Sequence, residues 1–136
     1  MRILVVDSDA RAREILVQRM RGRGFEIDSA GTAAEAIDLM TAARYDFVLL
    51  EVVMPHDAFA AITSWMEHVT APPRIVVTSS SAQLWMRANP NPKVAGVLQK
   101  PVSLEELLNV IGTHRAPIVA KFKTTARAKV ARRDAA

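Results

Sequence analysis

The sequence contains no cysteine among its 136 residues. This absence excludes disulfides, thiolate nucleophiles and cysteine metal clusters, and it agrees with a reducing compartment, so we expect a cytoplasmic protein. A long hydrophobic run is also missing at the N-terminus, where the charge of Asp7 follows only four apolar residues, Ile3 to Val6. That run is too short for a signal-peptide core or a membrane span, and we expect neither.

Repeats, low-complexity runs and a histidine metal motif are absent as well. His56, His68 and His114 do not have the spacing of metal ligands. Half of the residues are hydrophobic, which is enough for one full core in a chain of this length. We therefore expect a single domain that needs neither disulfides nor a structural metal.

Charge is distributed unevenly along the chain. Residues 1–112 hold 11 Lys and Arg against 13 Asp and Glu, whereas residues 113–136 hold 7 against 1. We therefore predict one domain at 1–113 and a basic C-terminal tail at 114–136. The tail is either a solvated end or a segment that contacts nucleic acid or an anionic membrane face. It lacks interleaved aromatic residues and the length of a helix-turn-helix, so we do not expect specific DNA readout.

Short runs rich in Val, Ile and Leu alternate with longer amphipathic stretches. This alternation is typical of repeated β-α units that build a parallel sheet. Several of the runs are nearly all apolar, as in strands covered by helices on both faces. The predicted strands are residues 3–7, 25–29, 46–51, 74–78 and 94–98.

The helices between these strands have one apolar side. In the first helix, Ala12, Ile15, Leu16 and Met20 form a stripe that is expected to face the sheet. The fourth helix is expected to be short, at 82–88, because two prolines follow it closely and prevent helical hydrogen bonding.

Polar residues collect where the predicted strands end. Asp7 closes the first strand, Glu51 the third and Thr78 the fourth, and Lys100 follows the fifth. In an open parallel sheet, ligands bind beyond the carboxyl ends of the strands. Carboxylates that hold a divalent cation, with a hydroxyl and an ammonium that contact phosphate oxygens, suit phosphoryl chemistry at this rim.

The sequence resembles the response-regulator receiver family of two-component signalling over about residues 2–112. The resemblance implies a flavodoxin-like (βα)5 three-layer α/β sandwich with strand order 2-1-3-4-5, and a signalling module rather than an enzyme. It rests on four motifs in the family's order, which are ILVVD at 3–7, LEVVMP at 50–55, VTS at 77–79 and KP at 100–101.

The resemblance also implies a role for each residue of the rim. In that family, two acids after the first strand bind Mg²⁺ and an aspartate at the end of the third strand accepts phosphate. By position, Asp7, Glu51 and the backbone carbonyl of Val53 correspond to metal ligands. Glu51 stands at the phosphoacceptor position. Thr78 and Lys100 correspond to the residues that contact the phosphoryl group and so sense phosphorylation.

Three residues depart from the family's pattern. Glu51 replaces the aspartate and carries its carboxylate one methylene further out, so we expect a poor acceptor that holds the domain partly in its activated form. Ser8 replaces the second acid, so we expect weak Mg²⁺ binding unless Asp9 substitutes for it. Val97 stands where the family has an aromatic switch residue. Natural divergence explains Glu51 best, and an engineered mimic of phospho-aspartate is the alternative.

We therefore expect an atypical stand-alone receiver that acts by binding a histidine kinase or a downstream effector. The expected output face comprises the helix at 82–88, the strand at 94–98 and the last helix, with Trp85 and Val97 on it. A homodimer through this face is a further expectation, and packing of Trp85 against the body is the alternative for that residue. The rival functions are a competent Mg²⁺-dependent receiver phosphorylated at Glu51, and nucleic-acid or scaffold binding through the tail.

The loop after the third strand is also unusual. It has His56, Asp57 and Ala58 where the family has a glycine with positive φ. We therefore expect this loop to be reshaped.

Overall fold

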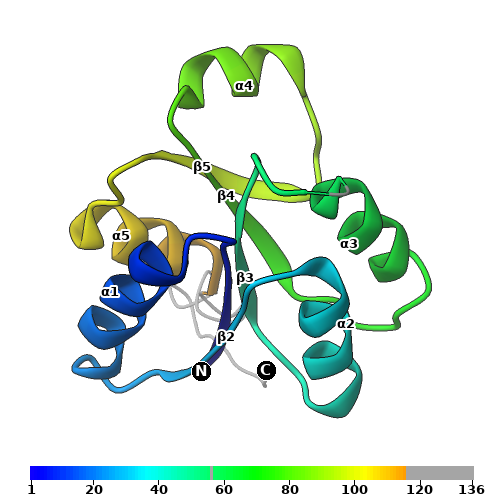
Figure 1. Cartoon of the computed structure of the whole chain (residues 1–136), viewed down its shortest axis with the longest axis horizontal. Coiled ribbons are helices and arrows are strands. Elements are labelled where there is room, and N and C mark those ends of the chain that lie inside the picture. The colour runs from blue at the N-terminus through cyan, green and yellow to red at the C-terminus, as the bar shows by residue number, and fades with distance from the viewer. Residues whose placement is uncertain (56, 116–136) are drawn as a thin grey trace, which may run out of the picture.

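A computed structural model describes residues 1–55 and 57–115 and has a five-stranded sheet covered by helices on both faces (Figure 1). Every predicted strand is present, and each observed end lies within one residue of its predicted position. The short helix at 82–88 is confirmed.

The strands are β1 (Arg2–Val6), β2 (Glu26–Ala30), β3 (Phe47–Glu51), β4 (Arg74–Ser79) and β5 (Val94–Gln99). The helices are α1 (Ala10–Arg21), α2 (Ala33–Ala42), α3 (Ala58–Met66), α4 (Ala82–Ala88) and α5 (Leu104–Arg115).

The sheet has the order β2-β1-β3-β4-β5 with all neighbours parallel, as predicted. The chain leaves β1 toward β2 on one side and later returns to β3 on the other. The loops therefore diverge above β1 and β3, and the crevice between them is the place where such sheets bind ligands. The predicted tail at 114–136 lies outside the described residues, apart from 114 and 115, which belong to α5.

The core has two halves, one on each face of the sheet. Helices α1 and α5 cover one face and α2 and α3 cover the other (Figure 1). Strand β3 is buried along its whole length, with Phe47 and Leu49 on the α1-α5 side and Val48 and Leu50 on the other. This two-sided burial explains why its sequence is a continuous apolar run.

The predicted apolar stripe of α1 is wrong at one residue. Ile15 was expected to face the sheet, but it is 46% exposed, while Val17 and Met20 are buried. The helix is rotated so that its buried side is centred on Val17, and an apolar residue therefore stands at the surface.

The loop between β3 and α3 keeps a positive φ without glycine. Asp57 has φ 49° and its side chain accepts a hydrogen bond from the backbone N–H of Ala60 at 3.4 Å. Aspartate tolerates the left-handed region better than most residues because its short side chain bonds locally. Asp57 thus supplies both the turn and the N-terminal cap of α3.

Tyr45, before β3, is tied to β1 and β2. Its Oη donates a 2.6 Å hydrogen bond to Asp28 Oδ2, which also accepts from Arg2 Nε at 3.1 Å. The bond from Tyr45, joined by the pairing with Arg2, lowers the pKa of Asp28 despite its partial burial. Burial of the phenol and its bond to the carboxylate raise the pKa of Tyr45 to about 12.

Titration of Tyr45 by ultraviolet absorbance is expected to show a midpoint near 12, against an ordinary value of 10.0. The chain has a single tyrosine, so the phenolate signal belongs to this residue alone. Because the folded pKa is raised, this group stabilises the fold below pH 10 and loses that contribution as pH rises through 12. In Asp28→Asn the midpoint is expected to fall but stay above 10, since burial remains. An unchanged midpoint in that variant would contradict the contact.

Candidate functional site

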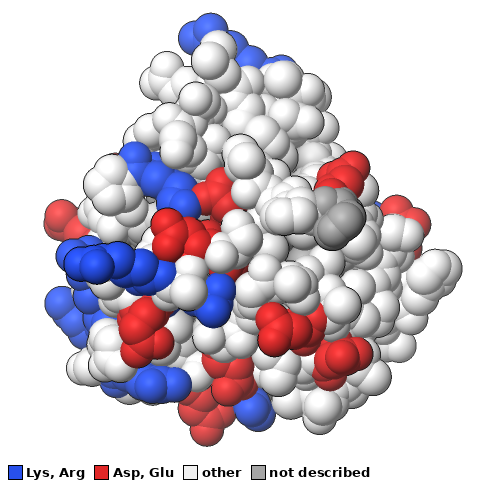
Figure 2. Space-filling model, viewed as in Figure 1, with Lys and Arg blue, Asp and Glu red and all other residues white. Residues whose placement is uncertain are grey.

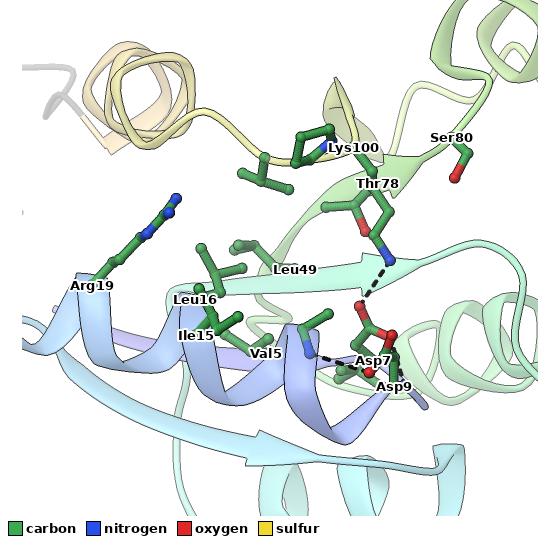
Figure 3. Close-up of a pocket in the computed structure, with 14 residues that line it drawn as sticks. Val5, Asp7, Asp9, Ile15, Leu16, Arg19, Leu49, Thr78, Ser80 and Lys100 are labelled. Carbon is green, nitrogen blue, oxygen red and sulfur yellow. Dashed lines mark hydrogen bonds and ion pairs between the residues drawn. The ribbon is translucent and has the colours of Figure 1, made fainter.

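The predicted rim residues come together at the carboxyl ends of the strands. Glu51 ends β3 opposite Thr78 of β4. Asp7 follows β1 and Lys100 follows β5, and Figure 3 shows both with Thr78. Asp7 and Glu51 are buried, which is unusual for charged side chains unless they are paired, and the uncharged Thr78 is buried as well. The structure therefore places four side chains that are far apart in the sequence around one point.

The Lys100 ammonium bridges the two carboxylates. Its Nζ lies 3.1 Å from Asp7 Oδ2 and makes a second, close ion pair with Glu51 Oε1. Burial alone would lower the pKa of Lys100, but the bonds to Glu51 and Asp7 outweigh burial and raise it. The lysine therefore stays protonated at neutral pH and offsets one of the two negative charges.

The second carboxylate oxygen of Asp7 and of Glu51 also accepts a hydrogen bond. Asp7 Oδ1 accepts a hydrogen bond from the backbone N–H of Asp9 at 2.9 Å, and Glu51 Oε2 accepts from the backbone N–H of Val53 at 3.0 Å. Each of the four oxygens thus has a partner within the protein. Charged acceptors bonded in this way lose hydration at little net cost, which explains how the pair is buried.

Arg13 is a site residue that the sequence reasoning missed. Its Nη1 donates a 2.6 Å hydrogen bond to the backbone carbonyl of Asp7, from one turn into α1. The bond holds the end of β1 against the helix and so helps to position the Asp7 carboxylate. No motif signals this contact, because it joins a side chain to a backbone atom.

Two carboxylates, those of Asp7 and Glu51, converge at this site, and no third acidic side chain of the described residues joins them. Asp9, the candidate replacement ligand, caps α1 instead, since its Oδ1 accepts from the backbone N–H groups of Arg11 and Ala12. Ser8 is exposed and carries no charge. Within residues 1–55 and 57–115, no group of three or more His, Asp or Glu side chains is placed to hold a metal ion. A hard cation bound here would share the carboxylates of Asp7 and Glu51 with Lys100.

Thr78 has a free hydroxyl. The residue is 4% exposed, and its Oγ1 makes no hydrogen bond with any described residue. Thr78 and Lys100 both line the pocket at this rim (Figure 3). A buried hydroxyl without a partner costs free energy, and such groups are typical of sites that bind a ligand oxygen.

The predicted output residues Trp85 and Val97 are both half-buried and pack against the same core cluster. Val97 is half-buried on β5 and lines a groove with Leu84 and Met86, which are 67% and 53% exposed. Trp85 does not line this groove, and its ring meets the Phe59 ring edge-on at 5.4 Å between centroids. The exposed apolar surface of α4 therefore belongs to Leu84 and Met86. An interface role for Trp85 stays a prediction.

A parallel sheet of this order, with two acids, a hydroxyl and a lysine at its carboxyl rim, defines a receiver-type signalling domain. The chain matches the family described as the response regulator receiver domain over residues 3–112, and it belongs to that family. The resemblance inferred from the sequence motifs is thereby confirmed.

Response regulators are also found among the relatives. Response regulator MprA of Mycobacterium avium is 32% identical over 109 residues, which cover 79% of this chain and 48% of the relative. The transcriptional regulatory protein PmrA of Pectobacterium parmentieri is 30% identical over 115 residues, which cover 79% and 49%. The chain spans about half the length of these relatives.

Solved receiver structures share the fold. A signal receiver domain from Bermanella marisrubri has a TM-score of 0.75 at 22% identity, covering 85% of this chain and 98% of that one. TrrA of Thermotoga maritima, solved in complex with Mg²⁺-BeF, has a TM-score of 0.71 at 23% identity and covers 82% and 96%. In the described part of the chain, every helix is too short or too polar to cross a membrane.

Proposed function

We propose that this protein is an atypical receiver that regulates by binding partner proteins, with phosphorylation impaired or absent. The observation that carries the proposal is the Lys100 bridge between Asp7 and Glu51, which completes the site without a metal or a phosphoryl group. As a binding module of two-component signalling, the protein would act without catalysing a reaction.

The contacts of Glu51 support a loss of acceptor function. Lys100 binds one carboxylate oxygen and the Val53 N–H binds the other, so attack on a phosphodonor would first break an internal bond. The extra methylene also displaces the nucleophile by about 1 Å, and a displacement of that size costs about 100-fold or more in rate. Both effects act on the Glu51 carboxylate, and both lower its rate of attack on a phosphodonor.

The same contacts support a domain held in one signalling state. The glutamate carboxylate supplies a permanent negative group for Lys100, as a phosphoryl group would do transiently. Val97 has no ring that changes position when a ligand arrives. The partner would be a histidine kinase or an effector that docks on the α4-β5-α5 face, where Leu84 and Met86 expose apolar side chains.

Incubation with acetyl phosphate and Mg²⁺ is expected to leave the mass of the intact protein unchanged, because the acceptor is engaged and one metal ligand is missing. Mass spectrometry under conditions that preserve acyl phosphates measures this directly. The double variant Ser8→Asp with Glu51→Asp is treated in parallel for comparison. A stable gain of one phosphoryl group that maps to Glu51 would instead support the competent receiver.

A further inference from the structure

A groove runs from the rim along the outside of the sheet, between α1 and the chain at 100–102 (Figure 3). Its volume is about 490 Å³, within the range of about 300–1,000 Å³ that is usual for small-molecule sites. The inner end reaches Thr78 and Lys100, and the outer end reaches Arg19 in the last turns of α1. The groove therefore continues well beyond the carboxylate pair.

The middle of the groove is apolar. Ile15 and Leu16 of α1 line one wall, Val102 lines the other, and Val5 and Leu49 form the floor. Ile15 is the residue that was expected in the core but is 46% exposed. Val5 and Leu49 are already buried, so Ile15 supplies the exposed apolar area that gains free energy when a ligand covers it.

The two ends of the groove carry polar groups of different kinds. Arg19 is exposed, and its guanidinium makes no hydrogen bond or ion pair with any described residue. Figure 2 shows basic side chains gathered over α1, so the outer end of the groove is positively charged. At the inner end, the buried Thr78 hydroxyl lies in a lining that also includes Asp7, Asp9 and Ser80, so the anionic group of a ligand is expected at the outer end. Lys100 already forms ion pairs with Asp7 and Glu51, so it is not expected to bind the ligand's anionic group.

We propose that this groove binds a small amphipathic anion, a carboxylate or sulfonate on an apolar body. The anionic group pairs with Arg19, the apolar body covers Ile15 and Leu16, and the inner end of the ligand reaches the Thr78 hydroxyl. A small molecule is favoured over a protein segment because the floor is recessed and the volume is that of a small ligand. The inference does not depend on the loss of phosphorylation, since it uses neither the nucleophile nor a metal.

Titration with 8-anilinonaphthalene-1-sulfonate, an aromatic sulfonate whose fluorescence rises in apolar sites, tests the proposal on the full chain. We expect saturable binding of one dye per protein and displacement by octanoate. Octanol, which has the same chain without the charge, is expected to displace the dye at about 5-fold or higher concentration, because it cannot pair with Arg19. Equal displacement by octanol would overturn the assignment of the anionic group.

Variants locate the site. Arg19→Gln is expected to weaken dye binding about 10-fold, and Ile15→Glu, at an exposed position that tolerates a polar residue, to abolish it. Arg21→Gln removes the same charge from the same helix. It is the matched control, because Arg21 lies on the side of α1 close enough to Asp28 to affect its pKa. Affinity that changes equally in Arg19→Gln and Arg21→Gln would show a general charge effect and overturn the proposal.

Amide chemical shifts measured with octanoate give a second readout that does not depend on the dye. Shifts are expected at Ala12, Leu16 and Val102. Shifts confined to Leu84 and Met86 would place the ligand in the α4-β5-α5 groove and overturn the proposal. Absence of saturable binding for both probes would also overturn it.

Discussion

Replacing Ser8 and Glu51 together by aspartate is expected to produce a protein that acetyl phosphate labels in a Mg²⁺-dependent reaction. Glu51→Asp withdraws the carboxylate by one methylene, which loosens its contact with Lys100 and restores the nucleophile's position. Ser8→Asp returns a carboxylate ligand beside Asp7. The expected gain in labelling rate over the unmodified protein is about 100-fold or more.

Each single variant is expected to gain much less than the pair. Both changes serve one metal, so their effects on the labelling rate should be strongly non-additive. Intact mass and Mg²⁺-dependent thermal stabilisation, measured on all four proteins, separate metal binding from phosphoryl transfer. A double variant that binds Mg²⁺ and still stays unlabelled would refute the roles of Thr78 and Lys100 as phosphate-reading residues.

Lys100→Met is expected to lower the free energy of unfolding by about 2–4 kcal/mol, because it leaves two buried carboxylates without a cation. We expect a smaller loss of unfolding free energy than for a fully buried ion pair, because the Lys100 side chain is 22% exposed. Chemical denaturation at neutral pH measures it. Adding Glu51→Gln to Lys100→Met removes one of the stranded charges, so the double variant is expected to recover much of the loss.

Lys93→Met is the matched control for that experiment. Lys93 pairs with Glu67 at 3.3 Å, but both side chains are about half exposed, so the expected loss is below about 0.5 kcal/mol. Similar losses in Lys93→Met and Lys100→Met would mean that the bridge is no stronger than a surface ion pair.

The pH dependence of the Lys100 contribution has a definite sign. The folded pKa of Lys100 is raised above its ordinary value of 10.5. Its contribution is therefore fully present below pH 10.5 and is lost as pH rises through the folded pKa. The stability difference between the protein and Lys100→Met should be constant from neutral pH to about 10 and shrink above that.

The fold was predictable because its signals are local. Apolar runs such as 46–51 alternate with amphipathic segments, and that alternation requires strands buried on both faces and joined by helices. The short α4 was predictable for the same reason, since two prolines after Ala88 remove backbone donors whatever surrounds them.

The membership of the site was also predictable from chain order. Asp7, Glu51, Thr78 and Lys100 each stand at or just after a strand, and parallel strands bring their carboxyl ends to one rim. Recognition of the receiver motifs then assigned their counterparts in the family. Both steps need the positions of the residues but not their contacts.

The contacts themselves were decided by tertiary structure. The Lys100 bridge, the use of Asp9 as a helix cap and the Arg13 bond to the Asp7 carbonyl join segments whose relative orientation no local pattern specifies. The same is true of Ile15 and Trp85. Helical spacing predicts which residues share a side, but the rotation of α1 and α4 against their neighbours decides whether that side is buried. The sequence by itself therefore determined the layers and the residues of the rim, while packing between distant segments determined how those residues are paired and which apolar side chains remain exposed.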